Sequence, residues 1–157
     1  MKRLYIAYGS NLNVRQMKTR CPKARLVGTA SLENHILYFR GSLTGSYLTI
    51  EPKIGAIVPV AVWEVTLSDE KALDRYEGYP SFYYKQDYTL QVTSMDKTKK
   101  TTLDCFAYVM RLDRPIGIPS NYYVYTCLEG YEYFGFEKRI LLNTVDRTRR
   151  ILCRRMK

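Results

Sequence analysis

Small polar residues follow directly after an apolar run near the N-terminus of the chain. The segment reads Tyr8-Gly9-Ser10-Asn11-Leu12, and the apolar residues 4–7 before it predict a short buried strand. Because residues 14–20 predict a helix, this segment is expected to form a tight turn between strand and helix. Backbone N–H groups in such a turn can point together at an anion or at an oxyanion that develops during a reaction. Gly9 lets a ligand approach the backbone closely, and Ser10 and Asn11 add side-chain donors and acceptors.

The same turn has a simpler interpretation. An asparagine before a helix often accepts a hydrogen bond from the first helical N–H groups. Asn11 or Asn13 could serve only as such a cap. Position alone does not separate the two interpretations, and the rest of the chain bears on the choice.

Glu77 is the candidate for proton transfer. It lies at the end of a predicted helix that Ser68 opens and that Gly78 and Pro80 stop. The negative end of the helix dipole disfavours a carboxylate there by about 0.3–1 kcal/mol. Burial would raise the pKa further, and such a glutamate can move protons near neutral pH. The alternative is an exposed residue at a helix end, without a function.

The residue inventory narrows the chemistry that the chain could perform. His35 is the single histidine, which excludes a site with several histidine ligands. The four cysteines form no CxxC pair, and this pattern is typical of reduced thiols in a cytoplasmic protein without a metal framework. We therefore expect no metal or cofactor, and we expect a carboxylate, a tyrosine or the substrate itself to handle protons.

The charge balance is strongly basic. The 157 residues carry a formal net charge of +10, and much of the excess lies in a basic tail from about residue 147. Such a tail could bind nucleic acid, although charge runs are more often solvated surfaces. No apolar run reaches the roughly 20 residues that a membrane span needs. The interrupted apolar start also predicts no signal peptide.

Hydrophobic patterning predicts one α+β domain over residues 1–157. It is expected to contain a mixed or antiparallel sheet, closed like a β-barrel and flanked by helices. The predicted strands are residues 4–8, 24–31, 35–40, 46–51, 57–66, 82–92 and 102–111. The predicted helices are residues 14–20, 68–76, 120–129 and 136–151. The third of these is expected to end at Gly130, and the strands at 82–92 and 102–111 to form a hairpin.

Four motifs, in this order, resemble the γ-glutamylcyclotransferase-like (AIG2-like) family. The first is residues 5–12, which is similar to the family's substrate-binding signature. The second is Leu73-Asp74 with Glu77-Gly78, followed by Tyr84 at a family-like distance. The third is residues 106–109 with Tyr108, and the fourth runs from residue 119 to about 136. The resemblance covers most of the chain, from about residue 4 to 140.

The resemblance implies an intramolecular acyl transfer. In that family the α-amine of a γ-glutamyl group attacks its own γ-carbonyl, which releases 5-oxoproline and an amine. The resemblance implies that Glu77 acts as the acid and base. It implies that the segment Tyr8 to Leu12 holds the substrate carboxylate and stabilises the oxyanion. It also implies that Tyr84 and Tyr108 orient the glutamyl end. Because side chains alternate along a strand, Tyr83 could take the place of Tyr84.

Several alternatives stay open from the sequence. The leaving group could be an α-amino acid, a lysine-type ε-amine or the amine of a biosynthetic intermediate. A non-catalytic small-molecule-binding module on the same fold is a second interpretation, because fold does not fix function. A nucleic-acid-binding protein that uses the basic tail is a third. The oligomeric state does not follow from the sequence.

Overall fold

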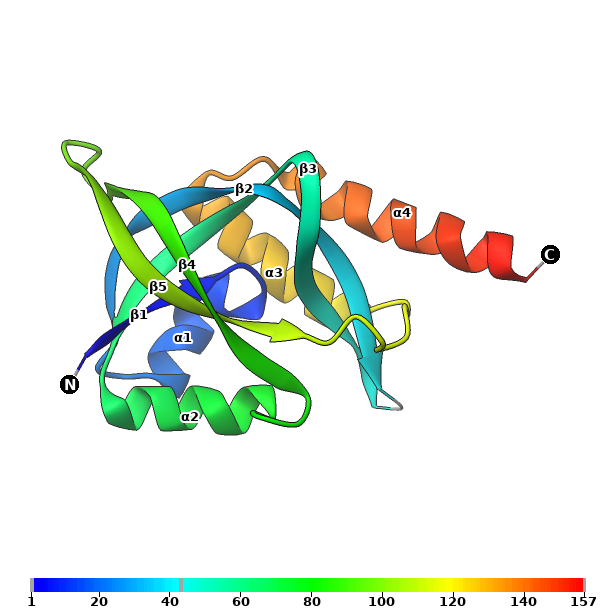
Figure 1. Ribbon diagram of the computed structural model, residues 1–157, viewed down its shortest axis with the longest axis horizontal. Coiled ribbons are helices and arrows are strands. Elements are labelled where there is room, and N and C mark those ends of the chain that lie inside the picture. Colours follow the sequence, from blue (N-terminus) through cyan, green and yellow to red (C-terminus); the bar gives the residue numbers. More distant parts are fainter. Residues whose placement is uncertain (1, 43, 157) are drawn as a thin grey trace.

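The structure is a computed structural model that describes residues 2–42 and 44–156, and it is built around a closed five-stranded barrel (Figure 1). The strands follow one another around the barrel in the order β1, β3, β2, β4, β5. All pairs are antiparallel except β1 with β5, which are parallel where Tyr5 meets Phe106. The predicted α+β class with a barrel-like mixed sheet is therefore confirmed. The strands are β1 Arg3–Ala7, β2 Arg25–Ser42, β3 Gly45–Val65, β4 Tyr83–Ser94 and β5 Lys100–Met110.

Two long strands replace four predicted short ones. β2 and β3 pair from Arg25↔Glu64 to Ser42↔Gly45, with one register shift between Leu26 and Gly28 and a second between Glu33 and His35. The polar residues that suggested a turn form this irregularity instead. Asn34 has a positive φ of 59°, and its side-chain oxygen accepts a hydrogen bond from the Gly55 N–H on the facing strand. The strands thus bend through the irregularity and do not end there.

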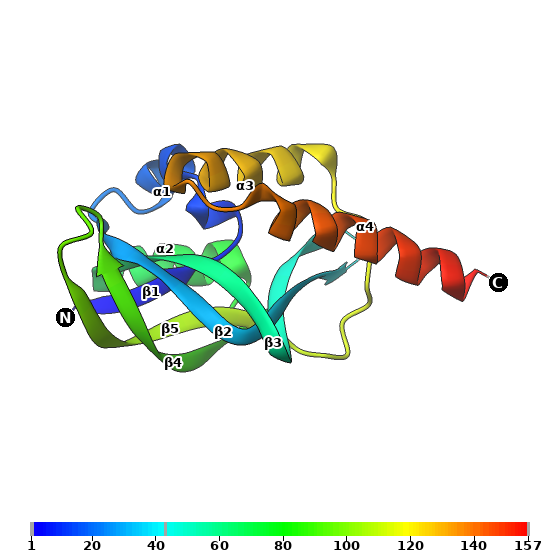
Figure 2. The same ribbon diagram turned by 90° about the horizontal axis from the view of Figure 1, so that it is seen from above.

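Helices cover the barrel on its outer faces (Figure 2). α1 Val14–Arg20 follows β1 through the short 3₁₀ turn η1 Ser10–Leu12, and α2 Leu67–Glu77 connects β3 to β4. α3 Asn121–Phe134 and α4 Lys138–Arg155 complete the chain. None of the helices in the described part of the chain has both the length and the apolar character required to cross a membrane.

The prediction that Gly130 ends a helix is wrong. α3 continues to Phe134, and Gly135, with a φ of 69°, forms the left-handed cap. Gly130 serves close packing instead, because a Cβ at this position would lie 2.4 Å from the Cβ of Leu12 and 2.6 Å from its carbonyl carbon. This contact seats α3 directly on η1. The helix therefore supports the turn that the sequence predicts to bind substrate.

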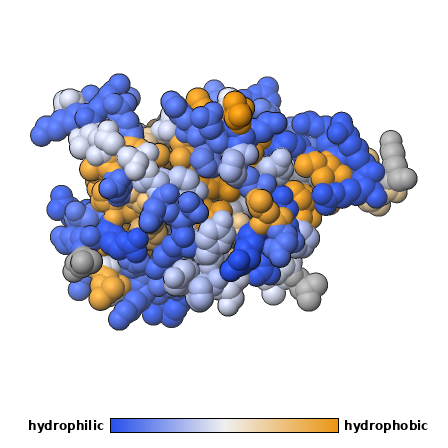
Figure 3. All heavy atoms as spheres, viewed as in Figure 1, coloured by the Kyte–Doolittle hydropathy of each residue, from blue (hydrophilic) through white to orange (hydrophobic). Residues whose placement is uncertain are grey.

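The basic C-terminal residues form a helix and not an irregular tail. α4 extends to Arg155, four residues beyond the predicted end, and its last turns project away from the barrel (Figures 1 and 2). In the space-filling view this projection shows a few hydrophobic side chains among hydrophilic ones (Figure 3). Arg147 remains attached to the body, where it donates a hydrogen bond to the Leu37 carbonyl.

Candidate active site

The turn after β1 lies at the wall of a cavity and is held through Asn11 by the side chains of Tyr5 and Arg20. Asn11 donates a hydrogen bond from Nδ2 to the Tyr5 hydroxyl at 2.9 Å, and its Oδ1 accepts one from Arg20. Asn13 provides the cap, since its side chain accepts from the Gln16 N–H at 3.2 Å. The simpler interpretation therefore applies to Asn13, whereas Asn11 has a different role and fixes the shape of the turn.

Two backbone N–H groups of this turn remain available. The turn's own hydrogen bonds run from the Leu12 N–H to the Gly9 carbonyl and from the Asn13 N–H to the Ser10 carbonyl, both 3.0 Å. Within the part of the chain that the structure describes, the N–H groups of Ser10 and Asn11 have no acceptor in the turn. Adjacent N–H groups of this kind are suited to a carboxylate or an oxyanion.

The cavity has a volume of about 390 Å³, and eight of the seventeen lining residues that the structure describes are aromatic. Its wall comprises Tyr5, Tyr8, Gly9, Ser10, Asn11, Ser42, Thr44, Tyr47, Leu48, Arg75, Tyr76, Glu77, Gly78, Phe82, Tyr83, Tyr108 and Tyr123. Of the predicted site residues, Glu77, Tyr8, Gly9, Ser10, Asn11 and Tyr108 thus meet in one place. This convergence joins the end of β1, the end of α2, the start of β4 and the end of β5.

Glu77 lies at the cavity because α2 ends there. The helix starts with a capping box between Thr66 and Asp69, and Gly78, with a φ of 66°, terminates it immediately after Glu77. Glu77 is half-buried against the aromatic wall. Loss of solvent raises the pKa of its carboxyl from 4.5 to about 8, although the positive charge of Arg20 acts in the opposite direction. The carboxyl can therefore both accept and return a proton near neutral pH.

The tyrosines of the wall are not bases. Burial raises the pKa of Tyr8 and of Tyr83 well above the ordinary value, and the charge of Glu77 adds to this effect. Both side chains are therefore phenols at neutral pH, which can hydrogen bond but cannot accept a proton from an ammonium group. The Tyr8 hydroxyl donates to the Tyr108 carbonyl, which ties the segment after β1 to the neighbouring strand β5.

Two predicted site residues lie outside the cavity wall. Tyr84 does not line it, whereas the preceding Tyr83 does, with its hydroxyl donating to the Leu48 carbonyl at 2.7 Å. Side chains alternate along β4, so Tyr83 and Tyr84 point to opposite faces of the strand, and Tyr83 is the one that reaches the cavity. Leu12 is fully buried beneath the turn against Gly130, so it supports the turn without facing the cavity.

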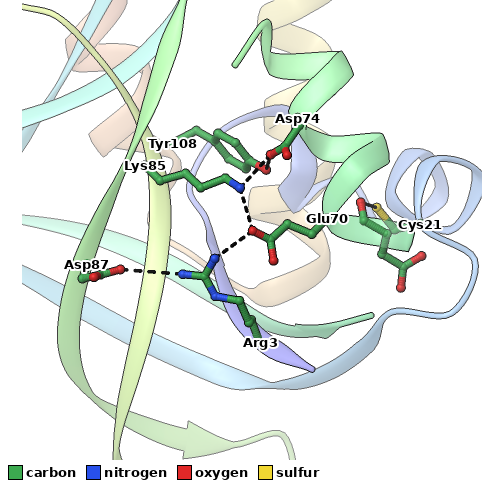
Figure 4. A network of polar contacts seen from close by, with 8 residues as sticks. Arg3, Cys21, Glu70, Asp74, Lys85, Asp87 and Tyr108 are labelled. Atoms are coloured by element: carbon green, nitrogen blue, oxygen red, sulfur yellow. Dashed lines mark hydrogen bonds and ion pairs between the residues drawn. The ribbon is translucent and has the colours of Figure 1, made fainter. Parts of the chain in front are cut away.

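Ion pairs between α2 and the strands that it covers fix Tyr108 (Figure 4). The Tyr108 hydroxyl donates to Oδ1 of Asp74 at 2.6 Å, and Lys85 Nζ lies 3.0 Å from the same carboxylate oxygen and 2.6 Å from Glu70. Arg3 pairs with Glu70 at 2.8 Å. Burial alone would lower the pKa of Lys85, but its hydrogen bonds to Glu70 and Asp74 outweigh this and raise it. The network therefore holds α2 to β4, β1 and β5.

Several wall residues were not predicted from the sequence. Tyr5, Tyr47, Tyr76 and Tyr123 come from four separate elements, and only the fold brings them together. Arg20 was also missed, although its guanidinium stacks 3.4 Å from the centre of the Tyr76 ring and holds Asn11. The unusually high number of tyrosines, fifteen in the chain, was the one sequence signal of an aromatic pocket. Across residues 2–42 and 44–156, no cluster of three or more histidine, cysteine or acidic side chains could hold a metal ion.

Comparison with known proteins places these features in context. The sequence model of the family described as "Gamma-glutamyl cyclotransferase, AIG2-like" matches residues 5–125. A solved structure named "Gamma-glutamyl cyclotransferase" is 25% identical, with a TM-score of 0.75 over 92% of this chain and 86% of that one. The human uncharacterized protein loc79017 is 26% identical, with a TM-score of 0.74 over 91% of this chain and 86% of that one.

A more distant neighbour shares the fold alone. The yeast γ-glutamyl cyclotransferase specific to glutathione is 12% identical, with a TM-score of 0.62 over 94% of this chain and 96% of that one. No curated protein sequence matches this chain.

Proposed function

This chain belongs to the gamma-glutamyl cyclotransferase, AIG2-like family, and we propose that it cyclises a γ-glutamyl compound to 5-oxoproline. In this reaction the α-nitrogen of the substrate forms a bond to its own γ-carbonyl carbon. The amide bond between that carbon and the leaving nitrogen breaks. Counted from the α-ammonium, two protons leave the α-nitrogen and two arrive at the leaving nitrogen, so the products are 5-oxoproline and the released amine as its ammonium ion.

The observation that carries the proposal is the position and the pKa of Glu77. Its carboxyl lines the cavity next to the turn, and its pKa is raised to about 8. The α-amine of a substrate has an ordinary pKa close to this value, so proton transfer from the ammonium to Glu77 is nearly balanced. We assign to Glu77 the acceptance of this proton and its return to the leaving nitrogen, a role typically worth 10²–10⁴-fold in rate.

The other wall residues are suited to positioning. The free N–H groups of Ser10 and Asn11 supply two donors for the substrate carboxylate or for the oxyanion of the tetrahedral intermediate. The glutamyl chain is enclosed by Tyr8, Tyr108 and Tyr83, the last of which takes the place predicted for Tyr84. Because the nucleophile belongs to the substrate, the enzyme accelerates the reaction chiefly by holding the chain in a folded, near-attack conformation.

The proposal is tested by 5-oxoproline release from γ-glutamyl amino acids and γ-glutamyl amines. Glu77→Gln keeps the size of the side chain and removes the proton acceptor, so turnover should fall at least 100-fold while substrate still binds. Glu33→Gln, on the exposed surface of β2, is the matched control and should retain full activity. Undiminished turnover by Glu77→Gln would exclude the assigned role, and absence of product from every compound would favour a non-catalytic binding module.

A further inference from the structure

The seven tyrosines of the cavity differ in how their hydroxyls are used. Six have protein partners, which leaves Tyr47 as the exception among residues 2–42 and 44–156. Its ring is half-buried in the wall, and its hydroxyl makes no hydrogen bond to the described part of the chain. A hydroxyl of this kind, at the edge of an otherwise satisfied aromatic wall, is available to a ligand.

Tyr47 belongs to a group of rings that meet edge to face. Its ring centre lies 5.3 Å from that of Tyr123 and 6.2 Å from that of Phe82, with interplanar angles of 78° and 84°. Phe82 in turn meets Tyr83 at 5.2 Å and 78°. We name these four residues, Tyr47, Phe82, Tyr83 and Tyr123, the aromatic slot. Rings at these distances and angles bind a further planar ring well, because edges and faces can pair in the preferred way.

The aromatic slot is rigid. The Tyr83 hydroxyl donates a hydrogen bond to the Leu48 carbonyl at 2.7 Å. The Leu48 N–H donates one to the Tyr123 hydroxyl at 3.1 Å. On the outer side, the Arg114 guanidinium lies 4.8 Å from the centre of the Phe82 ring and donates a hydrogen bond to the Ser81 carbonyl. Little conformational freedom is therefore lost when a ligand enters.

The aromatic slot opens next to the reacting centre. A Cβ on Gly9 would lie 3.1 Å from the Tyr123 hydroxyl oxygen and 3.6 Å from Leu48, so the turn and the slot are in direct contact. A γ-glutamyl group held by the turn therefore has its leaving side close to these rings. Charge is scarce in this region, because Arg75 and Glu77 are the only charged residues in the described part of the cavity wall and neither belongs to the slot.

We propose that the aromatic slot binds the leaving group and that the preferred substrates are γ-glutamyl amides of an alkylamine or amino acid that carries a planar aromatic ring. This inference rests on the proposed cyclotransferase function. An aromatic leaving group can pair with the rings of Tyr47, Phe82 and Tyr123, and a polar group on it can reach the free Tyr47 hydroxyl.

The test compares matched pairs of substrates. γ-Glutamyl-tyramine is compared with γ-glutamyl-ethylamine, and γ-glutamyl-tyrosine with γ-glutamyl-alanine, so that each pair differs in the ring alone. We expect kcat/KM to be at least tenfold higher for the aromatic member of each pair. The two pairs also distinguish an amine from an amino acid as the source of the ring.

Variants localise the effect to the aromatic slot. Tyr47→Ala should lower kcat/KM about tenfold for the aromatic substrates and less than twofold for the aliphatic ones, since it removes one aromatic pairing and one hydroxyl. Tyr47→Phe keeps the ring and should retain the preference for aromatic over aliphatic substrates. Tyr122→Ala, a highly exposed tyrosine on α3, is the matched control and should change neither series. Circular dichroism checks that each variant is folded.

The outcomes separate the two proposals. Equal kcat/KM for aromatic and aliphatic substrates, or a Tyr47→Ala loss shared by both, would overturn the slot assignment while the cyclotransferase function stands. Absence of product from all four compounds would overturn the function itself. In that case calorimetric titration of γ-glutamyl-tyramine and γ-glutamyl-ethylamine still tests the slot, and equal affinity or no binding overturns it.

Discussion

Replacing Glu77 by glutamine should stabilise the protein, and the gain should depend on pH. The carboxyl has a pKa of about 8 in the folded state against 4.5 ordinarily. Between these values the folded state keeps a proton that the unfolded state has released, so rising pH favours unfolding. Below pH 4.5 both states are protonated, and Glu77 has no effect of this kind. The amide that replaces the carboxyl in the variant does not titrate, so the variant does not lose stability in this way as the pH rises.

The magnitude follows from the shift in pKa. A difference of about 3.5 pH units, at about 1.4 kcal/mol per unit, gives a ceiling near 5 kcal/mol. For wild type, the destabilisation amounts to about 1 kcal/mol at pH 5 and approaches about 5 kcal/mol above pH 8. This would be a large fraction of the roughly 5–15 kcal/mol by which most domains are stable. At the pH where Glu77 accepts a proton, its burial would thus lower the free energy of unfolding of the protein by a large amount.

Urea unfolding of wild type and Glu77→Gln at pH 5 and pH 8.5 measures the effect. The variant should be more stable by several kcal/mol at pH 8.5 and by about 1 kcal/mol or less at pH 5. Glu33→Gln controls for the loss of one negative charge, and its exposed position predicts a small change at both values. A stabilisation that is the same at both pH values, or below about 1 kcal/mol at pH 8.5, would refute the reasoning.

Three further predictions address the turn, the network and the pH profile. The kcat/KM of wild type should rise about tenfold per pH unit below about pH 8 and fall above it, because Glu77 must be deprotonated while the free substrate, whose α-amine has a similar pKa, must still carry the proton that Glu77 passes on; a profile that is flat between pH 6 and 8 contradicts this. Gly130→Ala should destabilise the fold by about 1–3 kcal/mol in urea unfolding, because its Cβ would meet Leu12 at 2.4 Å, and wild-type stability would show that the contact relaxes freely. Asp74→Asn should lower kcat more than it raises KM, because it weakens the 2.6 Å hydrogen bond that positions Tyr108; a change in KM alone would place Asp74 in substrate binding only.

Local sequence signals predicted the parts of the site that lie within one segment. The glycine and small polar residues after β1 specified a turn, and Gly78 specified the helix end that leaves Glu77 at the cavity. The pair Tyr83-Tyr84 was left open because alternation fixes only that one of them points inward. The face of β4 that meets the cavity decides between the two, and the packing of β4 against distant parts of the chain sets that face.

Other parts depend on contacts that no local pattern contains. Tyr123 reaches the cavity because α3 packs on η1 through Gly130, a residue whose local pattern indicates a helix end. Asn34 indicates a turn, yet the long pairing of β2 with β3 absorbs it as an irregularity. In both cases tertiary packing overrides a residue that usually ends an element. The aromatic slot is correspondingly invisible in the sequence, since its rings come from β3, β4, the segment before β4 and α3.

The spacing of acidic residues along α2 explains how Glu77 is aimed despite the cost of burying it. Glu70, Asp74 and Glu77 are four and three residues apart, so they follow one another along one face of the helix. The first two are fixed by Lys85, and Glu70 also by Arg3, which sets the rotation of the helix about its axis (Figure 4). Once that rotation is set, the third carboxyl must point toward the barrel opening, where no lysine or arginine pairs with it within 4.0 Å in the described part of the chain. Two paired carboxylates thus hold in place the one whose raised pKa suits it to proton transfer.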